Sequence, residues 1–101
     1  MPHRDPRFNP ALKRALPADH AGGGWSMRVS DVWEVKFGNG KWRLARVRMW
    51  HRSRDGRDLV SMEWSTPPPD PATYGDWFYA DPERMREFED EPAEWSPWRR
   101  E

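Results

Sequence analysis

The stretch DVWEVKFGNGKWRLARVRMWH, residues 31–51, holds two runs rich in β-branched and aromatic residues on either side of Gly-Asn-Gly. In the first run Trp33, Val35 and Phe37 recur at every second position, and this period places one apolar row on one face of a β-strand. Residues 38–40 accept the positive φ angles that a tight hairpin turn requires. The stretch therefore predicts a β-hairpin with one face in the core.

The apolar pattern changes phase in the second run. Trp42 and Leu44 share one parity, whereas Ala45, Val47 and Met49 share the other, with Arg46 and Arg48 between them. A β-bulge or bend near Leu44-Ala45 would reconcile the two halves, as it does where a strand curls around a barrel. The alternative is a strand that is exposed to water on both faces beyond Leu44.

Further strand and turn signals follow the hairpin. Residues 53–57 have the composition of a turn, and residues 59–65 and 76–80 read as a third and a fourth strand. The proline-rich residues 66–71 form a loop between them, and residues 81–84 predict a helix or 3₁₀ turn capped by an aspartate. The residues expected in the core are Trp33, Val35, Val47, Val60 and Met62.

These signals divide the chain into three parts. Residues 1–24 are rich in Pro, Gly and Ala and predict a disordered or weakly helical arm. Residues 25–89 predict a mainly β domain, a small antiparallel barrel with a short C-terminal helical turn and flexible termini. Residues 90–101 form an acidic tail whose Trp95 and Trp98 either dock on the barrel or mark a partner site.

Length and composition exclude several classes of protein. The 101 residues make one domain at most, and the absence of cysteine excludes disulfides, thiolate metal sites and thiol catalysis. The three histidines, His3, His20 and His51, have no metal-ligand spacing, so we expect no metal and no cofactor. No apolar run is long enough for a membrane span or a signal peptide. The sequence predicts a cytoplasmic protein without a membrane partner.

The charges are balanced in number but not in position. The net charge is zero, yet residues 1–66 carry +6 and residues 67–101 carry −6. Either the acidic tail folds back on a basic face, or the two ends of the chain meet different partners. The plain alternative is a mixed surface that keeps the protein soluble.

Three segments together resemble the Tudor-like branch of the SH3-like barrels, over about residues 31–85. They are VWEVKFGNGKWRLARV, DLVSMEW and YGDWFYADPERM, which begin at residues 32, 58 and 74. The resemblance implies a barrel whose rim of aromatic rings encloses a methylated cation through cation-π attraction. The same pattern also resembles small proteins of high-GC bacteria, a likeness that implies no function.

The resemblance assigns rim positions residue by residue. It puts Phe37, Trp64 and Tyr74 on cage positions, and Arg43 where the family usually has another aromatic residue. A fixed positive charge at Arg43 would repel a cationic guest, which argues against recognition of methyl-lysine.

Three classes of function follow. The preferred one is a small non-catalytic adaptor that binds a protein or peptide through an aromatic rim: Phe37, Trp64, Tyr74 and Trp77. The alternative is nucleic-acid binding by a basic hairpin face: Lys41, Arg43, Arg46, Arg48, Arg52 and, for base stacking, Trp50. The only acid or base candidates for an enzyme are Asp55, Asp58, Glu63 and His51. These four are better explained as turn and surface residues, so we expect no catalysis. The sequence leaves the oligomeric state open.

Overall fold

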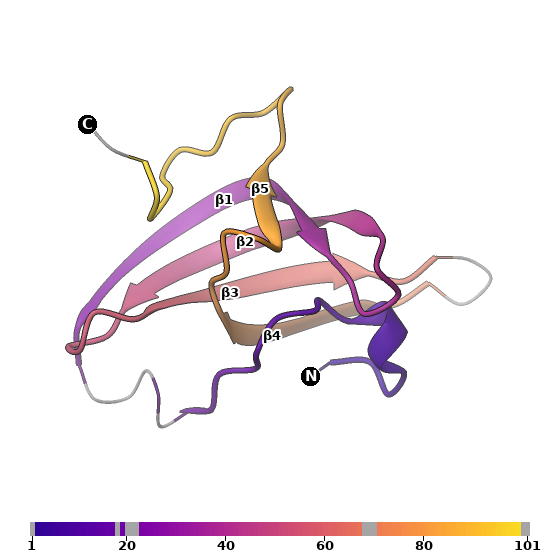
Figure 1. The fold of residues 1–101 in the computed structure, drawn as a ribbon, viewed down its shortest axis with the longest axis horizontal. Coiled ribbons are helices and arrows are strands. Elements are labelled where there is room, and N and C mark those ends of the chain that lie inside the picture. The colour runs from indigo at the N-terminus through magenta and orange to yellow at the C-terminus, as the bar shows by residue number, and fades with distance from the viewer. Residues whose placement is uncertain (1, 18, 20–22, 68–70, 100–101) are drawn as a thin grey trace.

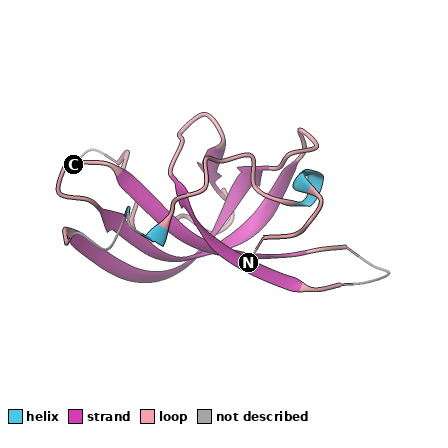
Figure 2. Cartoon of the chain, turned by 90° about the horizontal axis from the view of Figure 1, so that it is seen from below, coloured by secondary structure: helices cyan, strands magenta, loops and turns pink. Residues whose placement is uncertain are grey.

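The computed structural model describes residues 2–17, 19, 23–67 and 71–99. Five antiparallel strands form one sheet in the order β4-β3-β2-β1-β5, which confirms a mainly β, barrel-like fold. Figures 1 and 2 show that the sheet is strongly curved. The strands are β1 (Trp25–Lys36), β2 (Trp42–Arg52), β3 (Asp58–Ser65), β4 (Thr73–Tyr79) and β5 (Met85–Glu87), and a 3₁₀ helix, η1, covers Pro6–Phe8.

The predicted hairpin is the central element of this sheet. β1 and β2 pair from Lys36↔Trp42 at the turn to Trp25↔Arg52 at the far end. Gly40 has a φ of 81°, a left-handed conformation that favours glycine at this turn. The hairpin thus forms where the Gly-Asn-Gly sequence predicts it.

The predicted bulge lies elsewhere. The β1–β2 ladder runs without interruption through Leu44 and Ala45, so the predicted position is wrong. The register of β2 against β3 shifts between Val47 and Met49 instead, and a second irregularity interrupts β1 between Arg28 and Asp31. The apolar phase therefore changes four residues later than expected, because Arg48 and Met49 both stay outside the core before Trp50 enters it.

The core lies on the concave side of the curved sheet. All five residues predicted to be buried are buried, which confirms the apolar register of the strands. They pack in one cluster with Phe37, Ala45, Trp50, Trp64, Phe78 and Met85. Asp81 caps a single hydrogen-bonded turn before β5, in which the amide of Arg84 donates to the carbonyl of Asp81 (3.1 Å).

The N-terminal segment, residues 2–17, lies against the sheet and pairs with both β1 and the edge strand β4. The amide of Ala11 donates to the carbonyl of Lys36 at the end of β1 (2.8 Å), and the amide of Ala15 donates to that of Trp77 in β4 (2.9 Å). Bridges at Pro10 and Arg14 replace the predicted weak helix. Composition suggested disorder because it does not reveal a partner surface distant in the sequence. In Figure 1 this indigo segment runs beside β4.

The C-terminal tail covers another part of the core. The rings of Trp95 and Trp98 lie 5.3 and 6.3 Å from the ring of Trp50, and Trp98 also contacts Trp33. The carboxylate of Glu87 in β5 anchors the tail by accepting from the amide of Ala93 (2.9 Å) and from the guanidinium of Arg99 (2.6 Å). Of the two alternatives for the tail tryptophans, the structure has the docked one.

Candidate ligand-binding surface

Three of the predicted rim residues, Phe37, Trp64 and Tyr74, lie together in the structure. The ring centroids of Phe37 and Trp64 are 6.2 Å apart, and those of Trp64 and Tyr74 are 6.3 Å apart in a stacked arrangement. However, Phe37 is only 1% exposed and Trp64 only 3%. The indole N–H of Trp64 donates to the carbonyl of Phe8 (2.9 Å), so the N-terminal segment covers the rim.

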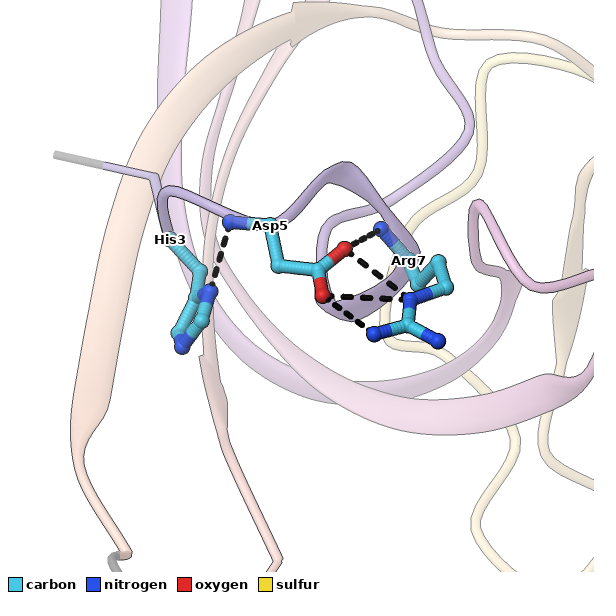
Figure 3. A network of polar contacts seen from close by, with 3 residues as sticks. All are labelled: His3, Asp5 and Arg7. Carbon is cyan, nitrogen blue, oxygen red and sulfur yellow. Dashed lines mark hydrogen bonds and ion pairs between the residues drawn. The ribbon is translucent and has the colours of Figure 1, made fainter.

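Polar contacts within the covering segment hold it in shape (Figure 3). The carboxylate of Asp5 accepts hydrogen bonds from the backbone and the guanidinium of Arg7, and these bonds lower the pKa of Asp5 to about 2. The amide of Asp5 donates to Nδ1 of His3 (2.9 Å), whose ring lies edge-on to Tyr74. The backbone of His3 is clasped by two hydrogen bonds to the amide side chain of Asn9, each of 2.8 Å. The part of the N-terminal segment that covers the rim is therefore held in a defined conformation by its own hydrogen bonds.

The fourth rim candidate, Trp77, lies away from the other three. The sheet register aligns Arg28, Met49, Ser61 and Trp77 in one row across β1 to β4. This row lies on the face opposite the core, which we call the outer face. Trp77 contacts the ring of His51 there. The aromatic rim predicted from the sequence is thus divided between two faces of the sheet.

The basic candidates have different surroundings. Arg52 forms an ion pair with Asp58 (2.8 Å), and Trp50 is buried among the tail tryptophans, where it cannot stack on a base. Arg43 lies over the ring of Phe37, with 5.0 Å from the guanidinium carbon to the centroid, and donates to the carbonyl of Ser65. No ion pair joins Arg43 or Lys41 to a carboxylate within the described part of the chain.

Three arginines, Arg28, Arg46 and Arg48, lie on the outer face, two of them beside Glu63. Arg46 lies opposite Glu63 in the β2–β3 ladder and donates to the hydroxyl of Ser30 (3.1 Å). Nε of Arg48 lies 3.8 Å from Glu63, and Arg28 makes no ion pair among the residues that the structure describes. Like charges on neighbouring strands repel each other, so this surface, which we call the arginine cluster, favours an anionic ligand.

A cleft opens beside this cluster where β2 and β3 separate. The ladder between the two strands ends at Arg46↔Glu63, although β3 continues to Ser65. The resulting cleft of about 450 Å³ is lined by Val32, Arg43, Leu44, Ala45, Arg46, Glu63, Trp64 and Ser65. Leu44 is 52% exposed there. Basic and apolar side chains thus share one surface.

Sequence reasoning missed the apolar part of this cleft. The sequence predicts a bulge or bend at Leu44, or a strand that is exposed on both faces beyond it, whereas the actual register puts Leu44 in a regular strand on the outer face near Val32. The alternation of Leu44 with the buried Ala45 does indicate that Leu44 points outward. That inference requires the bulge to lie at Arg48, where the structure has it. The cleft also joins residues from two separate predictions, because Trp64 lines it together with Arg43 and Arg46.

The four acid and base candidates each contact different neighbours, so they do not form one group. Asp55 accepts from Ser53 and then Arg57 within a turn, and these bonds lower its pKa. Nδ1 of the buried His51 lies 2.7 Å from the hydroxyl of Ser26. Among the described residues, no group of three or more His, Asp or Glu side chains could hold a metal ion. Within the same residues, no helix has the length and apolarity to cross a membrane.

Comparison with protein-family models, with curated proteins and with solved structures finds no match for this chain. Its class is therefore defined by its own geometry. It is a small mainly β, barrel-like domain whose rim is covered by its N-terminal segment and whose outer face presents a basic and apolar cleft.

Proposed function

We propose that this protein is a small non-catalytic interaction module that binds a peptide segment of another protein. The binding surface in this proposal is the cleft between β2 and β3, and the ligand combines acidic and apolar side chains. The observation that carries it is the exposed Leu44, flanked in the cleft by Arg43 and Arg46, neither of which forms an ion pair within the described part of the chain.

The outer face replaces the aromatic rim as the binding site for a physical reason. A ligand at the rim would have to displace the N-terminal segment, which pairs with β1 and β4 through backbone hydrogen bonds. The cleft demands no such displacement. Full burial of a leucine side chain contributes about 1.5–3 kcal/mol, and the arginines add steering and orientation of an acidic partner.

The test is a peptide selection on the full chain. We expect the wild-type protein to enrich peptides in which Asp or Glu neighbours a large apolar residue. Leu44→Asp should weaken the selected peptides by about tenfold or more, because it removes the apolar contact and adds a like charge. Lys41→Glu is the matched control, since Lys41 is exposed and lies outside the cleft lining. Enrichment that survives Leu44→Asp would contradict the proposal.

Nucleic-acid binding is the second candidate, and the arginine cluster is the observation that favours it. In this case affinity for an oligonucleotide must fall steeply between about 50 and 200 mM salt, because phosphate contacts release counterions. Arg46→Glu with Arg48→Glu should then abolish binding and leave the fold intact. Micromolar oligonucleotide binding with both properties would replace the peptide proposal.

A further inference from the structure

An acidic turn follows β5 and projects from the domain. Residues 88–91 close on themselves, because the amide of Glu91 donates to the carbonyl of Phe88 (3.1 Å). Glu89, Asp90 and Glu91 are all exposed. No ion pair joins these three carboxylates to a basic side chain in the part of the chain that the structure describes. In Figure 1 the orange chain after β5 extends away from the sheet before it turns back.

The arginine cluster has the complementary property. Arg28, Arg46 and Arg48 face solvent on the outer face, and Glu63, the carboxylate opposite Arg46, cannot neutralise three cations. Glu34, which lies diagonal to Arg46, is already paired with Arg86. The chain as a whole carries no net charge, because the +6 of residues 1–66 is equal in size to the −6 of residues 67–101. Such a molecule attracts copies of itself at low ionic strength.

One molecule does not bring these two surfaces together. β5 pairs with β1 at Trp33–Val35, on the opposite edge of β1 from β2. Arg86 is held by Glu34 (2.6 Å) on one side of the turn, and Glu87 is held by Arg99 (2.6 Å) as the tail returns. These ion pairs hold the acidic turn at the β5 edge, and among the described residues no ion pair joins its carboxylates to the arginine cluster of the same molecule.

We propose that the arginine cluster of one molecule binds the acidic turn of a second copy of this chain. The inference rests on the proposed function, because it names a partner segment for the same outer face. Each molecule offers one cluster and one turn, so the contact is heterologous and builds head-to-tail assemblies. The contact joins exposed charges and is therefore weak and sensitive to salt.

Sedimentation velocity of the full-length protein tests the proposal. At low salt, the weight-average sedimentation coefficient should rise with protein concentration. Between about 20 and 300 mM salt, the apparent dissociation constant should rise about tenfold or more, since the screening length falls below the span of the contact. A protein that stays monomeric at low salt over the whole concentration series overturns the proposal.

Charge reversal identifies the surfaces. Arg28→Glu with Arg46→Glu, and separately Glu89→Lys with Glu91→Lys, should each give a monomer, because like charges then face each other across the contact. An equimolar mixture of the two variants should associate again, since each reversed surface meets its complement. Lys41→Glu should associate as the wild type does, and thermal melts check that every variant is folded.

Two outcomes separate this inference from the proposed function. If the protein is monomeric but selected peptides still depend on Leu44, the second-copy contact fails and the peptide module stands. If association persists in either reversed variant alone, the assembly uses another surface and the inference is overturned.

Discussion

At the scale of single residues, Trp33 joins the strand core to the tail. It is buried, and its ring lies 5.6 Å from that of Trp50 and 5.8 Å from that of Trp98. We predict that Trp33→Ala lowers the free energy of unfolding by about 3–5 kcal/mol, because a large cavity would open among packed rings. Chemical denaturation measures this. Trp25→Ala is the control, since Trp25 is 42% exposed, and an equal loss in both variants would contradict the prediction.

Asp5 gives the rim cover a dependence on pH. Its pKa lies at about 2 in the folded protein, below the ordinary value of 3.8, because Arg7 hydrogen-bonds its ionised form. A lowered pKa stabilises the fold above the ordinary value, and this contribution is lost as the pH falls from about 4 to about 2. We predict that the amides of Ala11 and Ala15 lose protection in this range, measured as their hydrogen-exchange rates relative to the intrinsic rates at each pH.

The comparison with Asp5→Asn isolates this contribution from other carboxylates. Asp19, Asp55 and Asp81 also have lowered pKa values, so their protonation in acid destabilises the folded protein as well. Asp5→Asn should exchange faster than wild type at neutral pH, and the difference between the two proteins should vanish near pH 2. A difference that is constant over the whole range would rule out the role of Asp5.

At the scale of elements, the N-terminal segment acts as part of the barrel. It covers the buried rings of Phe37 and Trp64 and supplies backbone partners to β1 and β4. We predict that removal of residues 2–17 lowers the free energy of unfolding by several kcal/mol, since each newly exposed ring costs about 1.5–3 kcal/mol. This loss is a large share of the total stability of about 5–15 kcal/mol that is typical of small domains.

Thermal melts followed by circular dichroism measure the effect of this truncation. Asn9→Ala is a milder variant, since it removes only the clasp on His3 and leaves the backbone pairing possible. Its midpoint should fall between those of the full chain and the truncated chain. A truncated chain that melts at the wild-type temperature would restore the domain boundary at residue 25 that the sequence suggests.

The elements differ in how well the sequence predicts them. The hairpin follows from local alternation and a glycine-containing turn, and both are visible within residues 31–51. The bulge was misplaced, because Arg48 and Met49 are both acceptable on a wet face and alternation cannot say which of several outward positions holds the extra residue. The pairing of Ala15 with Trp77 was missed, because no local pattern reports a partner so far along the chain.

In the candidate site, too, local features were predictable and contacts between distant parts of the chain were not. Phe37, Trp64 and Tyr74 were named together from the sequence, and their rings lie close to one another in the structure. Their cover could not be predicted, because it depends on the docking of the N-terminal segment. The cleft at Leu44 required the actual register of β2. A single misplaced bulge was enough to hide it, since a shift by one residue moves every following side chain to the other face.

At the scale of the whole molecule, both terminal segments complete a core that the five strands leave open. The N-terminal segment seals the side of Phe37 and Trp64, and the tail seals the side of Trp33 and Trp50. A chain of 101 residues can build only a small core, so apolar residues of both terminal segments add substantially to it. The remaining open surface is the outer face, which is why the proposed contacts gather there.

The docked tail also bears on the order of events during translation. Trp33 and Trp50 obtain their final covering only from Trp95 and Trp98, which leave the ribosome long after β1 and β2 have been made. Until then the indole rings of Trp33 and Trp50 in the nascent hairpin are exposed to solvent. Contacts between residues so far apart in the sequence form slowly. The emerging chain therefore passes through an aggregation-prone stage, in which these rings are only partly covered, before Trp95 and Trp98 dock.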